Sequence, residues 1–125
     1  MVLSLSSRKC EPGVTVIELA GHLTLSRESD RIEIAIVTAL NEGARSVVID
    51  LSRVGYVDSS GIGVIAYCFG KISHKGAHAA VSGSSGMVMD VLKLTRLGSV
   101  ISCFPDVASA CEGLAAAAPS VAPSA

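Results

Sequence analysis

Residues 46–70 read SVVIDLSRVGYVDSSGIGVIAYCFG, and this stretch decides the fold. It begins with a near-continuous apolar run of strand length, residues 46–52, which predicts a strand buried on both faces. A helix is expected to follow, from Ser59 or Ser60 to about His74. Its apolar residues recur at spacings of three and four: Ile62, Ile65, Phe69 and Ile72.

Segments typical of strands and of helices alternate on both sides of this stretch. Strands are expected at residues 2–5, 14–21, 77–83 and 100–104, and helices at residues 27–42, 87–94 and 106–118. Ser26 and Asp106 are expected to cap the first and last of these helices. The alternation predicts an α/β fold with parallel strands and crossover helices. We expect one domain over residues 1–117 and a disordered tail at 118–125.

The composition argues against several classes of protein. The chain of 125 residues has a net charge of -1, without the basic excess that nucleic acids or anionic lipid surfaces attract. Although 50% of its residues are hydrophobic, charged and small residues interrupt every apolar run before the roughly 18 residues of a membrane span. The N-terminal residues show no secretory signal, so we expect a cytoplasmic protein.

The four cysteines are Cys10, Cys68, Cys103 and Cys111. They form no Cys-x-x-Cys pair and have no histidine at zinc-ligand spacing. We therefore expect free, buried thiols in a reducing compartment, with no metal site. No cofactor motif is found either.

Asp58, Ser59 and Ser60 stand where an extended segment gives way to the helix. Backbone N–H groups without partners favour oxygen acceptors there, so capping alone can explain these residue types. The residues that follow offer more apolar surface than one buried face uses, which also allows a protein-docking patch that includes Ile62, Val64 and Ile65. A phosphate on Ser59 would add about -1.5 to -2 charges beside Asp58 and would oppose docking of an apolar or acidic partner.

From Val14 to Leu114 the chain resembles the anti-sigma factor antagonists of the STAS (sulfate transporter and anti-sigma factor antagonist) domain class. The most specific part is the hydrophobic strand, the Asp-Leu pair at Asp50, the six-residue gap and the Asp-Ser-Ser-Gly-hydrophobic-Gly run, all in register. The resemblance implies a mixed sheet of about four to five strands, with about four helices packed mainly on one side.

The resemblance also implies a function in bacterial transcription regulation by partner switching, without catalysis. An anti-sigma factor that is a serine kinase of the histidine-kinase-like ATPase type would bind the unphosphorylated protein and phosphorylate Ser59. A serine phosphatase would reverse the modification. The partner-binding residues implied are Asp58, Ser60, Gly61, Ile62, Gly63, Val64 and Thr24. We expect a monomer or weak homodimer that binds neither nucleic acid nor membrane.

One loop departs from the family pattern. Many phosphorylatable members have Gly-Glu-Leu-Asp where this chain has Gly21-His22-Leu23-Thr24, so an acidic pair that could face the kinase is missing. The departure bears on the identity of the partner more than on the fold. Thr24 and Ser26 can add hydroxyls to the same surface, although simple loop capping also explains them.

Two alternatives stay open on the sequence alone. The same fold also serves as a non-switching subunit of a lipid-transport ATPase complex or of a stress-sensing assembly, in which Ser59 only caps the helix. A hydrolase would need Ser59 to pair with His22, His74 or His78. The sequence does not favour hydrolase chemistry, because it lacks the Gly-x-Ser-x-Gly turn of a nucleophile elbow.

Overall fold

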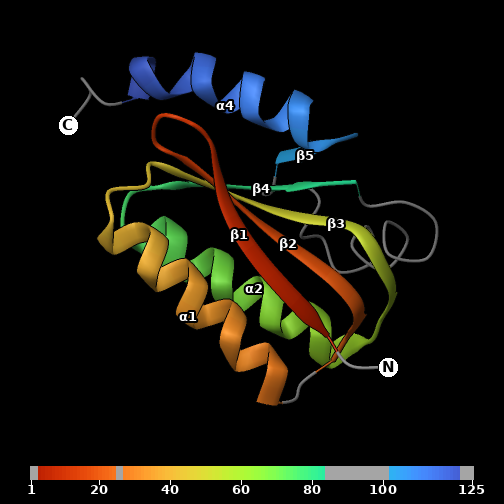
Figure 1. The fold of residues 1–125 in the computed structure, drawn as a ribbon. Helices are drawn as coiled ribbons and strands as arrows, with labels where there is room; N and C mark the ends of the chain where they lie inside the picture. The colour runs from red at the N-terminus through yellow and green to blue at the C-terminus, as the bar shows by residue number, and fades with distance from the viewer. Residues whose placement is uncertain (1–2, 25–26, 84–101, 122–125) are drawn as a thin grey trace.

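A five-stranded mixed sheet forms the centre of the protein (Figure 1), as expected from the sequence. The computed structural model describes residues 3–24, 27–83 and 102–121. The strands lie in chain order: β1 Ser4–Glu11, β2 Val14–Leu23, β3 Ser46–Val57, β4 His78–Ser82 and β5 Ser102–Phe104. β1 pairs with β2 in antiparallel fashion, and all later neighbours are parallel.

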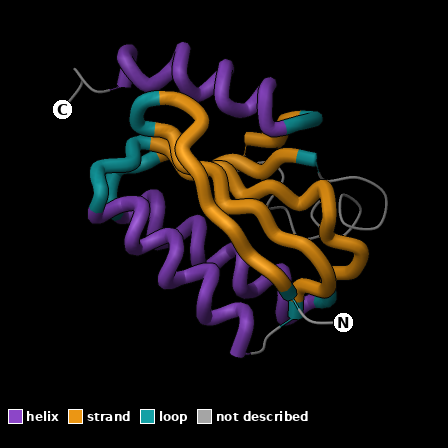
Figure 2. Tube along the Cα trace, in the orientation of Figure 1, coloured by secondary structure: helices purple, strands orange, loops and turns teal. Residues whose placement is uncertain are grey.

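The described helices cover both faces of the sheet, and Figure 2 shows the strands as a layer between them. They are α1 Arg27–Asn41, α2 Ser59–His74 and α4 Val107–Val121. α1 and α2 share one face, as expected for most of the helices, and α4 covers the other face. The expected helix at 87–94 and the cap at Ser26 lie outside the described residues.

Alternate residues of the central strands supply two separate hydrophobic cores. Ile49 and Leu51 of β3 pack in the core beneath α1 and α2, whereas Val48 packs in the core beneath α4. This alternation follows from the period of two along a strand. The apolar run of residues 46–51 is therefore buried on both faces, as the sequence predicts.

Two strands differ in extent from the prediction. β1 runs to Glu11 instead of ending near residue 5, because it forms an edge strand whose exposed polar side chains conceal its strand character. β3 continues past residue 52 to Val57, where it pairs with Leu23 at the end of β2. The cap at Asp106 is confirmed, because its Oδ1 accepts a hydrogen bond of 2.7 Å from the backbone N–H of Ser109. α4 extends into the expected tail, and residues 122–125 are not described.

Asp50 connects two neighbouring strands from within the buried part of the sheet. It accepts hydrogen bonds from the hydroxyl of Ser82 on β4 at 3.1 Å, and from the hydroxyl and backbone N–H of Ser52 at 3.0 and 3.2 Å. A buried carboxylate is tolerated when donors of this kind surround it. The aspartate of the Asp-Leu pair is thus a structural residue.

The prediction of four free, buried thiols is only partly correct. Cys10 on β1 and Cys111 on α4 form a disulfide across 101 residues of sequence. Both side chains pack at the core beneath α4, which no local spacing of cysteines reveals. Among the described residues, Cys68 is a free and buried thiol as expected, whereas Cys103 is exposed.

We expect the disulfide to stabilise the attachment of α4 to the sheet. Disulfides typically contribute about 2–4 kcal/mol to the free energy of unfolding, with the larger values for long loops. After air oxidation, denaturant unfolding should show this loss with a reductant or with Cys111→Ser, whereas Cys103→Ser should change stability by less than about 0.5 kcal/mol. Equal unfolding midpoints with and without reductant, or four titratable thiols after oxidation, would contradict the pairing.

Candidate functional site

The candidate site lies at the corner where β2 and β3 end and α2 begins. Leu23 and Val57 pair at the ends of the two strands, and Asp58 leads from Val57 into the helix. Gly61 in the first turn of α2 is buried against the end of β2. A Cβ on Gly61 would overlap the carbonyl oxygen of Leu23 and lie 2.9 Å from a methyl group of Val57. Only glycine permits this close approach.

Asp58 is the N-cap of α2, as the sequence predicts. Its backbone is extended, with φ -108° and ψ -176°. Its Oδ1 accepts a hydrogen bond of 2.6 Å from the hydroxyl of Ser60 and one of 2.8 Å from the backbone N–H of Gly61. The Ser60 hydroxyl, followed by the Gly61 N–H, lowers the pKa of Asp58 because both bonds favour the carboxylate.

The two adjacent serines differ in what their hydroxyls do. Ser59 is exposed, and its hydroxyl makes no hydrogen bond to the described residues. Ser60 is half-buried and donates its hydroxyl to Asp58. The corner therefore presents the hydroxyl of Ser59 to solvent and uses that of Ser60 in the cap.

A hollow of about 390 Å³ lies beside Ser60, between α1 and α2. Asp30 and Glu33 on α1 place two carboxylates at its edge. From α2 it is lined by Ser60, Gly63, Val64 and Tyr67, among others. The acidic side chains that the loop at 21–24 lacks thus occur on the neighbouring helix.

The structure exposes some of the residues that were expected to bind a partner and buries others. Gly63 is exposed, and Asp58, Ser60, Val64 and Thr24 are partly exposed. Gly61 and Ile62 are buried, so they cannot contact a partner in this conformation. The apolar patch expected from Ile62, Val64 and Ile65 is reduced to Val64, because both isoleucines pack in the core.

Exposed apolar surface occurs elsewhere. The large hydrophobic side chains that are exposed in the described part of the chain are Ile34, Val37, Tyr56 and Tyr67. Tyr56 packs against His22, with ring centroids 5.4 Å apart.

The sequence gives no support to a serine–histidine pair, and neither does the structure. His74 ends α2, roughly 20 Å from Ser59 at the helical rise per residue. No hydrogen bond joins Ser59 to His22 or His78 within the described segments. In those same segments, no cluster of three or more His, Cys, Asp or Glu residues could hold a metal ion.

A polar cluster between α1 and α2 was missed by sequence reasoning. The Nζ of Lys71 lies 2.8 Å from Glu33 Oε2, to which the Tyr67 hydroxyl donates a hydrogen bond of 3.2 Å. The same Nζ lies 5.5 Å from the centre of the Tyr67 ring. Lys71 lowers the pKa of Glu33, and Glu33 raises that of Lys71. The spacing of four between Tyr67 and Lys71 puts them on one helix face, but it gives no sign of Glu33.

The packing of Gly61 can be tested against Gly63, two residues further along α2. Gly61→Ala should lower the free energy of unfolding by roughly 3 kcal/mol or more, because the new methyl group collides with backbone. A Cβ at Gly63 meets no atom within 4 Å, so Gly63→Ala should raise stability by up to about 1 kcal/mol. Urea unfolding measures both, and equal effects of the two substitutions would contradict this packing.

The cap also predicts a dependence of stability on pH. Asp58 has a folded-state pKa below its ordinary value of 3.8, so its contribution is complete above that value and is lost as the pH falls through the folded pKa. The thermal unfolding midpoint of the wild type should therefore fall more steeply than that of Asp58→Asn as the pH drops below about 4. A difference between the two proteins that stays constant from pH 7 to pH 2 would argue against the charged cap.

The chain is similar to a known domain family and to several solved structures. The model of the STAS domain matches residues 7–110. A search of curated proteins gives no match.

In the described segments, no helix is both long enough and apolar enough to cross a membrane.

Four solved structures illustrate the shared fold. The anti-sigma factor antagonist SpoIIAA in its unphosphorylated form has a TM-score of 0.76 and 20% identity, with 90% of this chain and 97% of that chain covered. A second structure of SpoIIAA, from Bacillus, shows the phosphorylated form. An anti-sigma factor antagonist from Mycobacterium paratuberculosis has a TM-score of 0.75 and 20% identity, over 90% and 94% of the two chains.

The fourth structure is described as a member of the sulfate transporter family. A sulfate transporter family protein from Wolinella succinogenes has a TM-score of 0.69 and 15% identity, over 86% and 88% of the two chains. At these identities the structures establish a shared fold and nothing beyond it. The family model, in contrast, spans most of the sequence. The chain belongs to the STAS domain family.

Proposed function

We propose that this protein is an anti-sigma factor antagonist that works by partner switching. It binds an anti-sigma factor serine kinase of the histidine-kinase-like ATPase type while Ser59 is unphosphorylated, and phosphorylation of Ser59 releases it. The observation that carries the proposal is the exposed hydroxyl of Ser59, which is free of hydrogen bonds to the described residues at the first position of α2. A serine phosphatase restores the binding form.

The electrostatics of the corner support a switch rather than a change of fold. A phosphate on Ser59 would bring about -1.5 to -2 charges next to the carboxylate of Asp58. The N-terminus of a helix tolerates such charge, so α2 should stay folded. The added charge would instead increase the cost of desolvating this surface when an apolar partner surface docks on it.

The docking surface that we propose extends from Ser59 along the start of α2. It comprises Ser59, Ser60, Gly63 and Val64, with Thr24 from the end of β2. Asp30 and Glu33 border it on α1, and Asp30 can provide an acidic contact that the loop at 21–24 lacks, because Glu33 is already paired with Lys71. The SpoIIAA structures support the choice of function, because that antagonist has been observed in both phosphorylation states.

The remaining properties follow from this function. The protein would have no catalytic activity and no cofactor, and it would act in the bacterial cytoplasm as a monomer or weak homodimer, without binding nucleic acid or membrane. A reducing cytoplasm would keep Cys10 and Cys111 as thiols. The two hydrophobic cores would still bury the same apolar residues, while the protein would lose the stability that the bond contributes.

A non-switching subunit is the second candidate. It is favoured by the structure of the sulfate transporter family protein, which shares the fold without being described as an antagonist. In this case Ser59 would serve only the helix start, and a charge at position 59 would leave partner binding nearly unchanged.

Affinity capture from native lysate distinguishes the two candidates. Baits of wild type, Ser59→Ala and Ser59→Asp are compared by mass spectrometry, with Ser60→Ala as the matched control at the neighbouring hydroxyl. The switch predicts that only Ser59→Asp loses a kinase-like ATPase. If all four baits retain the same non-kinase complex, the protein is a structural subunit and the switch is wrong.

A further inference from the structure

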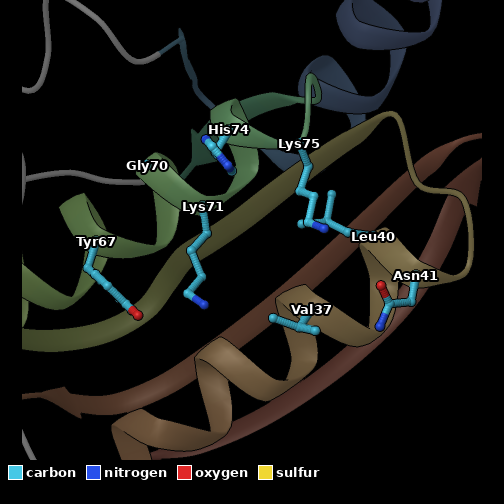
Figure 3. Close-up of a pocket in the computed structure, with 8 residues that line it drawn as sticks. All are labelled: Val37, Leu40, Asn41, Tyr67, Gly70, Lys71, His74 and Lys75. Carbon is cyan, nitrogen blue, oxygen red and sulfur yellow. The ribbon is translucent and has the colours of Figure 1, made fainter.

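A second hollow lies between the C-terminal halves of α1 and α2, at the end of these helices away from Ser59. This groove has a volume of about 590 Å³ (Figure 3). Pockets of roughly 300–1,000 Å³ are typical of small-molecule sites. Tyr67 lines both this groove and the hollow beside Ser60, so the cluster of Tyr67, Glu33 and Lys71 lies between them.

The groove combines an apolar wall with positive charge. Val37 and Leu40 line it from α1, and the ring of Tyr67 lines it from α2. Val37 is 36% exposed and Tyr67 is 56% exposed, so apolar surface of both side chains is accessible to a ligand. Lys71 and Lys75 also line the groove, and none of the described residues that line it is acidic. Figure 3 shows both lysine side chains reaching from α2 toward α1.

The two lysines differ in how far their charges are compensated. Lys71 is paired with Glu33 at 2.8 Å. Lys75 makes no ion pair with any residue that the structure describes. The groove therefore has an uncompensated positive charge next to an apolar surface, which is complementary to a ligand with one anionic group and an apolar body.

Gly70 keeps the groove open. It lies in the interior of α2, where glycine is less favourable than alanine. A Cβ at this position would meet no atom within 4 Å, so packing within the described chain does not require glycine there. Any larger side chain would project into space that the groove now leaves empty.

We propose that this groove binds a small amphipathic anion. The anionic head, a carboxylate or a similar group, would lie near the ammonium of Lys75. The apolar body would lie along Val37, Leu40 and the ring of Tyr67, over Gly70. This site is separate from Ser59 and does not depend on the proposed switch.

The proposal can be tested with decanoate as the probe, by NMR titration of the ¹⁵N-labelled full chain at concentrations below micelle formation. Saturable shifts should concentrate on the amides of α1 and α2 that line the groove. Decyltrimethylammonium, which has an alkyl chain of similar length but the opposite charge, should bind at least about tenfold more weakly. Inorganic phosphate alone should not saturate the site, because it lacks the apolar body.

Three variants locate the site. Gly70→Leu fills the groove and should weaken decanoate binding at least about tenfold, while leucine favours the helix. Lys75→Glu reverses the charge and should weaken it by a similar factor. Gly63→Leu makes the matching change in the other hollow of α2 and should leave decanoate affinity unchanged. The backbone spectra of all three variants verify folding.

Several results would overturn the proposal. These are shifts outside the groove, equal binding of the anionic and cationic probes, or unchanged decanoate affinity in both Gly70→Leu and Lys75→Glu. Loss of a captured protein with Gly70→Leu, when decanoate does not bind the wild type, would show a docking surface for a macromolecule instead. Ser59→Asp should bind decanoate like the wild type, so failure of the switch and failure of this site are distinguishable.

Discussion

The close approach of α2 to the end of β2 is the constraint on which the site depends. Gly61 lies against the carbonyl of Leu23, and this contact fixes where the helix begins relative to the paired ends of β2 and β3. With the start of α2 held in place, Asp58 caps the helix and occupies the hydroxyl of Ser60. Ser59 is then the hydroxyl that the corner presents to solvent. One steric condition thus determines which serine is accessible.

The same helix connects three regions with different chemistry. Its start carries the proposed switch, its middle carries the ion pair of Lys71 with Glu33, and its end lines the groove with Lys75. Tyr67 borders both hollows, because it projects from the middle of the helix. The proposed modification site and the proposed ligand site therefore lie on one helix without being in contact.

Local sequence patterns predicted the structural features that depend on residues close together in the chain. The buried strand at 46–51, the start of α2 and the caps at Asp58 and Asp106 all follow from residue type and spacing along a single element. Contacts between distant elements were not predictable in this way. The Cys10–Cys111 disulfide depends on α4 covering the second face of the sheet, which periodicity does not reveal. Burial at the corner was also not predictable, because an apolar residue near a cap can face either the core or a partner, and Ile62 faces the core.

The proposed switch is tested by incorporating phosphoserine at position 59 or at position 60 and measuring the affinity of each protein for the captured kinase. A switch at Ser59 predicts that phosphoserine at this position weakens binding at least about tenfold while the fold is retained. Unchanged affinity with phosphoserine at 59 would contradict it.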